Sequence, residues 1–132
     1  MNKRWTSSKH ATYNCAYHLI WCPKYRRSVL VDGVDVRLKE LLYEKAKEHE
    51  WVIENMEIMS DHVHVFIKVF PVDSPTFVVS QLKGYSSFML RNEFQWLKSR
   101  IPTLWTRSYY CESIGHISEA TIKKYIDEQK NK

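Results

Sequence analysis

The feature that most constrains this chain is a short apolar run, residues 62–70, that begins with two histidines one residue apart. In a β-strand successive side chains point to opposite faces, so His62 and His64 share one face. The other face is β-branched and suits a hydrophobic core; it consists of Val63, Val65, Ile67 and Val69. Two imidazoles on one strand can bind one cation from a fixed direction. The run therefore predicts a core strand that carries half of a metal site.

Length and composition fit one domain, residues 1–132, which is large enough to bury a core without disulfides. Three scattered cysteines, Cys15, Cys22 and Cys111, favour reduced thiols over a disulfide framework or a zinc ribbon. The net charge of +5 is a mild indication of a polyanionic partner. An ordinary, slightly basic domain is an equally good interpretation of that charge.

No apolar run in the sequence approaches the length of a membrane span. The N-terminal residues Met1 to Trp5 lack the apolar stretch of a signal peptide. We therefore expect a cytoplasmic protein with no membrane partner.

Hydrophobic periodicity predicts the order β-α-β-β-α-β, followed by one extra helix. The strands are expected at 12–22, 51–59, 62–70 and around 109–113. The helices are expected at 34–49, from 75 to about 98, and from Ser118 onward. This is an α+β, ferredoxin-like or RRM-like fold: a four-stranded antiparallel sheet with two helices on one face. Gly84 interrupts the second helix and predicts a close approach of backbone or ligand.

The extra helix carries Tyr125 and Gln129 on one face, one turn apart. Taken alone, this face is best interpreted as an ordinary apolar stripe. Beside His62 and His64 a second interpretation arises, because a tyrosine hydroxyl can be a nucleophile and Gln129 offers an amide oxygen as a third ligand. Two imidazoles and one oxygen, with positions left for phosphate oxygens, suit Mg²⁺ or Mn²⁺.

The motif His62-Val63-His64 is similar to the His-hydrophobic-His motif of HUH endonucleases. Segments spread over nearly the whole chain resemble the single-tyrosine (Y1) HUH transposases of bacterial and archaeal insertion sequences. They are residues 17–27, 82–87, 105–110, 115–118 and 121–129.

The resemblance implies a transposase that moves an insertion sequence as single-stranded DNA and recognises hairpins near the element ends. It assigns Tyr125 as the nucleophile that forms a 5′-phosphotyrosine, and His62, His64 and Gln129 as ligands of the catalytic metal. It also implies a homodimer in which the helix at about 118–131 completes the site of the partner subunit. No nucleotide cofactor is expected, because the tyrosyl phosphodiester conserves the energy of the broken bond.

Basic residues are candidate contacts to the DNA backbone; they are Lys24, Arg26, Arg27, Lys83, Arg91 and Arg107. For the cluster at 24–27, a solvated loop is an equally good interpretation. Asp61 is either a partner that orients a ligand imidazole or only a turn residue. Tyr85 and Trp105 either stack on bases or pack in the core, and the core is favoured. His18, His49 and His116 are interpreted as structural or surface histidines.

Two other functions fit parts of the sequence. A domesticated HUH nuclease that serves its host would share every motif above. A non-catalytic RRM-like nucleic-acid-binding module would use the same sheet, with Phe66 and Phe70 stacking on bases. That module gives no reason for Tyr125 and Gln129, and it would bind without metal or cleavage.

Overall fold

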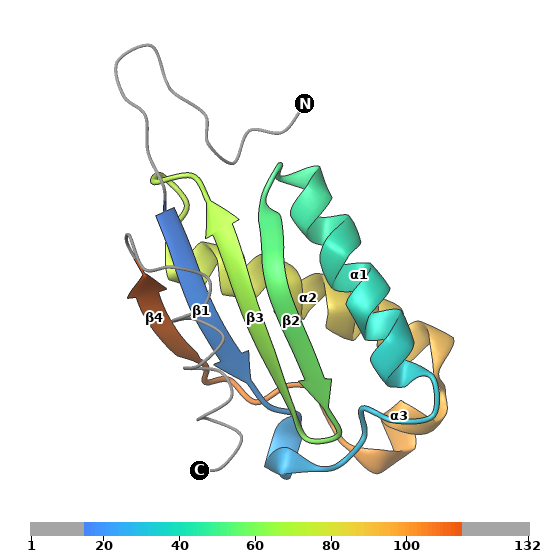
Figure 1. Ribbon diagram of the computed structural model, residues 1–132. Coiled ribbons are helices and arrows are strands. Elements are labelled where there is room, and N and C mark those ends of the chain that lie inside the picture. Colours follow the sequence, from blue (N-terminus) through green and yellow to red (C-terminus); the bar gives the residue numbers. More distant parts are fainter. Residues whose placement is uncertain (1–14, 115–132) are drawn as a thin grey trace.

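The computed structural model of the chain describes residues 15–114. The strands are β1 (Cys15–Trp21), β2 (Val52–Met59), β3 (His62–Val69) and β4 (Tyr110–Ile114). The helices are η1 (Lys24–Arg26, a 3₁₀ turn), α1 (Val34–Glu48), α2 (Pro75–Glu93) and α3 (Trp96–Arg100). The predicted α+β class and βαββαβ order are confirmed (Figure 1). The predicted helix at 118–131 lies outside the described residues.

The four strands form one antiparallel sheet in the order β2-β3-β1-β4. Strand β3 is therefore a central strand, hydrogen-bonded to β1 on one side and to β2 on the other. Helix α2 crosses behind the sheet in Figure 1, and α1 lies along α2 and beside β2. This arrangement leaves the opposite face of the sheet without a helix among residues 15–114.

The hydrophobic core lies between the sheet and the two long helices. Val63, Val65 and Ile67 of β3 are fully buried, as the alternation of that strand predicts. The helices contribute apolar residues at helical spacing; those fully buried include Leu38, Leu41, Leu42, Val78, Leu82 and Leu90. The three cysteines are free thiols, as predicted. Within residues 15–114, no helix has both the length and the apolar character that a membrane crossing requires.

Helix α1 begins at a tight turn that needs a glycine. Gly33 precedes the helix with φ +96, and Asp32 before it has φ 55. Only glycine adopts such a backbone without a steric cost, because its Cβ is missing. A Cβ built at Gly33 would lie 3.6 Å from the ring of Phe94, so this turn also packs against the end of α2.

Helix α2 begins as predicted, because the Ser74 side chain accepts a hydrogen bond from the Phe77 N–H at 3.1 Å and Pro75 takes the first position. The prediction that it continues to about Lys98 is wrong. The helix ends at Glu93, where Phe94 adopts φ −119 and ψ 87, and α3 follows. Phe94 packs partly buried against the core, and Leu97 of α3 is fully buried, so the break lets both reach apolar partners.

Gly84 lies on the exposed side of α2, and no atom from outside its own stretch of the helix comes within 4 Å of the position that its Cβ would occupy. The expectation of a close backbone approach at Gly84 is therefore wrong. The approach of a ligand to this position stays a prediction.

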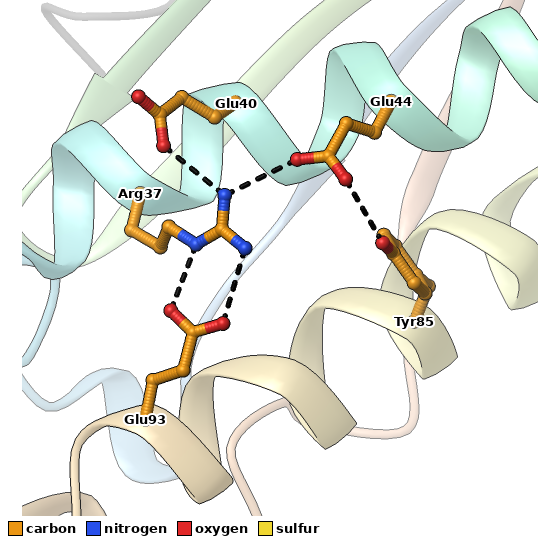
Figure 2. A network of polar contacts seen from close by, with 5 residues as sticks. All are labelled: Arg37, Glu40, Glu44, Tyr85 and Glu93. Carbon is orange, nitrogen blue, oxygen red and sulfur yellow. Dashed lines mark hydrogen bonds and ion pairs between the residues drawn. The ribbon is translucent and has the colours of Figure 1, made fainter.

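A polar network joins α1 to α2 (Figure 2). The Arg37 guanidinium donates two hydrogen bonds to Glu93, at 2.8 and 3.1 Å, and one each to Glu40 and Glu44 at 3.1 Å. The Tyr85 hydroxyl donates to Glu44 at 3.1 Å, and its ring packs against the core. The hydrogen bonds from Arg37 lower the pKa of Glu93. For Tyr85, the core-packing interpretation is the one that the structure supports.

Candidate metal centre

The histidines lie on the face of the sheet that carries no helix among residues 15–114. Pairing in the ladder places His64 opposite Ile20 of β1 and Glu57 of β2, and it places His18 of β1 opposite Phe66. Directly opposed residues share a face. His18, His64 and Phe66 are 0%, 1% and 2% exposed. This second face therefore carries a layer rich in imidazole whose central residues are buried, in contrast to the hydrocarbon layer under the helices.

His62 and His64 lie side by side on this face, as their spacing predicts. Their ring centroids are 4.8 Å apart and their planes cross at 68°. Both are fixed by a central strand with hydrogen-bonded neighbours on each side, so their relative position is set by the fold before any ligand binds.

Asp61 orients the His62 ring. The Asp61 Oδ1 atom lies 2.7 Å from His62 Nδ1, and its Oδ2 accepts a hydrogen bond from Arg26 at 3.1 Å. The hydrogen bond with His62 is the main cause that lowers the pKa of the Asp61 carboxyl, and the nearby Arg26 guanidinium lowers it further. An ionised Asp61 only accepts, so we assign the proton of a neutral His62 to Nδ1. The lone pair is then on Nε2, the arrangement that a metal-binding histidine needs.

His18 is part of this layer, and sequence reasoning did not find it as a site residue. Its ring stacks on His64 with centroids 5.7 Å apart and an angle of 24°. Burial lowers the pKa of His18, and the effect of Glu112 opposes this shift. At neutral pH the ring is uncharged and can pack beside a cation site without repelling the cation. The signal in the sequence is the alternation of residues 15–21, which puts His18 on the face opposite Tyr17 and Leu19.

His49 has a different environment. It stacks on Trp51 with ring centroids 4.2 Å apart and hydrogen-bonds Gln81 at 3.1 Å. His49 is thus a structural histidine, as interpreted from the sequence. His116 lies outside the part of the chain that the structure describes.

The basic cluster at residues 24–27 lies beside the histidines. The hydrogen bond from Arg26 to Asp61 joins the loop after β1 to the turn before β3. The backbone bond from Leu30 N to Ser60 O, at 3.0 Å, ties the same two segments together. The structure therefore brings three candidate DNA contacts, Lys24, Arg26 and Arg27, to the edge of the predicted metal site.

Lys83 and Arg91 have structural hydrogen bonds to the backbone. The Lys83 ammonium donates to the carbonyls of Thr106 and Ser108 at 2.6 and 3.2 Å, and burial lowers its pKa. Arg91 donates to the carbonyl of Ile101 at 3.1 Å. Both side chains hold the segment that leads into β4, so this structural role accounts for them. Contact with DNA by Lys83, Arg91 or the exposed Arg107 stays a prediction.

Trp105 belongs to the core. It is buried, its Nε1 donates to Ser86 Oγ at 3.1 Å, and its ring meets Trp21 edge-on at 5.9 Å. Core packing, and not base stacking, is therefore its role.

Across residues 15–114, no three His, Cys, Asp or Glu side chains are grouped so that they could hold a metal by themselves. Tyr125 and Gln129 lie outside these residues. The described residues thus bring two imidazoles together, with His62 hydrogen-bonded to Asp61. The metal site itself, its third ligand and the nucleophile stay predictions.

Comparison with known proteins identifies the family. Residues 11–129 match the profile of a family described as "Transposase IS200 like". The chain belongs to the IS200-like transposase family. It is 36% identical over 122 residues to the ISDra2 transposase TnpA of Deinococcus radiodurans, covering 91% of this chain and 87% of that one. It is 31% identical over 125 residues to the transposase for insertion sequence element IS200 of Salmonella typhimurium, covering 93% and 82%.

Solved structures agree with this membership. A crystal structure from Deinococcus radiodurans R1, named as a transposase, superposes with a TM-score of 0.77 at 33% identity and covers 94% of this chain and 97% of that one. A REP-associated tyrosine transposase bound to a REP hairpin superposes with a TM-score of 0.59, covering 92% and 69%. At 10% identity, that second likeness shows the fold alone.

Membership in the IS200-like family confirms the resemblance drawn from the motifs and supports a transposase, an enzyme of DNA recombination. The RRM-like module would stack Phe66 and Phe70 on bases, but Phe66 is buried and Phe70 packs partly buried against the core.

Proposed function

We propose that this transposase cleaves and rejoins single-stranded DNA at insertion-sequence ends, through a 5′-phosphotyrosine on Tyr125 and with Mg²⁺ or Mn²⁺ held by His62, His64 and Gln129. The observation that carries the proposal is the pair of imidazoles on central strand β3, with His62 oriented by a carboxylate. Family membership supports the transposase activity, and the pair of imidazoles supports its metal dependence.

His62 and His64 fit the proposed cation. Asp61 keeps His62 in the tautomer whose Nε2 is the ligand atom, and the sheet holds His64 beside it. A bound Mg²⁺ or Mn²⁺ would supply positive charge to the non-bridging oxygens of the scissile phosphate. Because the sheet fixes both rings, little rearrangement is needed when the phosphate arrives.

In the cleavage step, the Tyr125 hydroxyl oxygen forms a bond to phosphorus and the bond from phosphorus to the 3′-oxygen breaks. The phenolic proton is lost to solvent, and the departing 3′-oxygen gains one, which leaves a 3′-OH. Rejoining is the same exchange in reverse, with the 3′-OH of another DNA end as attacking group. No nucleotide cofactor enters, because each exchange replaces one phosphodiester by another.

The proposed DNA partner is a single strand with hairpins near the element ends. The hairpin bound to the REP-associated tyrosine transposase, a protein of the same fold, supports this partner. The basic loop at residues 24–27, beside the histidines, supports a phosphate backbone passing that edge. We further propose a homodimer in which the helix at about 118–131 completes the site of the partner subunit.

The proposal is tested by incubating the full chain with Mn²⁺ or Mg²⁺ and single-stranded DNA from the region that flanks its gene. Denaturing electrophoresis should reveal a covalent protein–DNA adduct that EDTA abolishes. His64→Ala should abolish the adduct, whereas His49→Gln, a change at a structural histidine of the helix-covered side, should retain it. Equal cleavage by His64→Ala and the wild type would show that the metal assignment is wrong.

A further inference from the structure

The loop after β1 adopts a backbone that its side chains disfavour. Tyr25 has φ 59 and ψ 18, and Arg26 has φ 51, so two consecutive residues with a Cβ lie in the left-handed region. Such residues persist only where the surrounding structure holds them, and they concentrate at ligand-binding positions.

The loop is held at several points. Lys24 N donates to Leu104 O at 2.8 Å, and Pro23 forms a bridge with Trp105. On the far side, Arg26 contacts Asp61, as described above. The unfavourable conformation is therefore built into the fold and is present before any ligand binds.

The result of this conformation is an aromatic ring presented to solvent. Tyr25 is 65% exposed, although most large aromatic side chains within residues 15–114 pack against the core. The Lys24 ammonium lies 5.3 Å from the centre of its ring, and the Arg27 guanidinium lies 6.0 Å from it. An exposed ring with two cations close to it is a combination that binds unpaired nucleotides, because the ring can stack on a base while the cations meet phosphates.

The Tyr25 ring belongs to the loop that contacts the residue orienting His62. Tyr25 precedes Arg26, whose guanidinium contacts Asp61, and Asp61 orients His62. We propose that Tyr25 is a stacking platform for one unpaired DNA base next to the scissile phosphate, on a loop that the Arg26–Asp61 contact joins to the turn before His62. This inference rests on the single-stranded DNA substrate proposed above.

The variant that tests the platform is Tyr25→Asn, because asparagine tolerates the left-handed backbone and removes the ring. Tyr25→Phe keeps the ring and loses the hydroxyl. Phe88→Leu is the matched control, since Phe88 is 67% exposed but lies on α2, which covers the opposite face of the sheet. Arg27→Gln removes one flanking cation and keeps the ring. Circular dichroism spectra compare the fold of each variant with the wild type.

Binding is measured by fluorescence anisotropy with a single-stranded oligonucleotide from the DNA that flanks the gene, over a range of salt concentrations. Tyr25→Asn should weaken binding about 5- to 150-fold, the usual contribution of one stacked base, without changing the salt dependence. Tyr25→Phe and Phe88→Leu should bind like the wild type. Arg27→Gln should reduce the slope of log K against log salt by about 0.7, the value for one phosphate contact on a single strand.

A set of oligonucleotides with 2-aminopurine at successive positions locates the base. One position should be quenched by the wild type and should regain its fluorescence with Tyr25→Asn. Wild-type affinity of Tyr25→Asn, or a loss that appears only as a smaller salt slope, would overturn the platform. The proposed function fails separately: a wild-type protein that forms no covalent adduct contradicts the nuclease, whatever the Tyr25 variants bind.

Discussion

The contact between Asp61 and His62 makes a quantitative prediction about metal affinity. Asp61→Ala removes the 2.7 Å hydrogen bond to His62 Nδ1 and also the 3.1 Å bond from Arg26. Without its acceptor, the His62 ring can rotate and change tautomer, so Nε2 is no longer held as the ligand atom. Asp61→Asn is the milder change, because its amide oxygen still accepts from Nδ1 but carries no charge.

The expected loss of metal affinity follows from the type of each hydrogen bond that Asp61 makes. Loss of a carboxylate that orients a ligand histidine typically costs 10- to 100-fold in metal affinity, or about 1.4–2.7 kcal/mol. The Arg26 bond contributes little, because the Arg26 side chain is largely exposed and water screens the pair. Asp61→Ala should therefore weaken Mn²⁺ binding about 10- to 100-fold, Asp61→Asn less, and Arg26→Gln by about threefold or less.

Electron paramagnetic resonance of unbound Mn²⁺, titrated with the full chain and no DNA, measures these affinities directly. Thermal unfolding of each variant separates a lost ligand geometry from a lost fold. If Asp61→Ala binds Mn²⁺ as tightly as the wild type, Asp61 is only a turn residue. If Arg26→Gln loses as much as Asp61→Ala, the ion pair and not the His62 bond controls the site.

Three further predictions concern the fold that holds the site. Arg37→Gln should lower the free energy of unfolding by about 1 kcal/mol at pH 7 in urea titrations, since the pair with Glu93 is partly exposed. Because the pKa of Glu93 is lowered in the folded state, this loss should be present above the unfolded pKa and should disappear as pH falls through the folded pKa. Leu82→Ala, at a fully buried position, should cost about 2–5 kcal/mol, whereas the exposed Val36→Ala should cost under about 0.5 kcal/mol; equal losses would contradict the described core. Gly33→Ala should lower the melting temperature through a penalty of about 1–2 kcal/mol at φ +96, and an unchanged melting temperature would show that the turn is not strained.

Local patterns predicted most of the described fold. The alternation of residues 62–69 placed the valines in the core and the two histidines on the other face, and both placements are present. The break after α2 was missed because Leu90 and Leu97, seven residues apart, keep the helical spacing across it. Where the helix ends, Phe94 packs against the core, a tertiary contact that no local pattern contains.

In the candidate site, too, local features could be predicted from the sequence and features that depend on long-range contacts could not. The pairing of His62 with its neighbour Asp61 is local, and it was one of two interpretations of Asp61 that the sequence left open. The stacking of His18 on His64 depends on β1 lying next to β3, a pairing of strands far apart in the chain. The left-handed conformation at Tyr25 also depends on tertiary bonds. Tyr125 and Gln129 stay predictions, because they lie outside the described residues.

The phosphotyrosine step is tested most directly by finding which residue of the protein carries which fragment of the DNA. Single-stranded DNA from the flank of the gene, labelled at either its 3′ or its 5′ end, is incubated with Mn²⁺, and the adduct is digested and mapped by mass spectrometry. If Tyr125 is the nucleophile, the 3′-labelled fragment is bound through its 5′-phosphate to the peptide that contains Tyr125, the 5′-labelled fragment is released with a 3′-OH, and Tyr125→Phe forms no adduct. A 5′-labelled adduct, attachment to another tyrosine such as Tyr110, or an adduct that survives Tyr125→Phe would contradict this assignment.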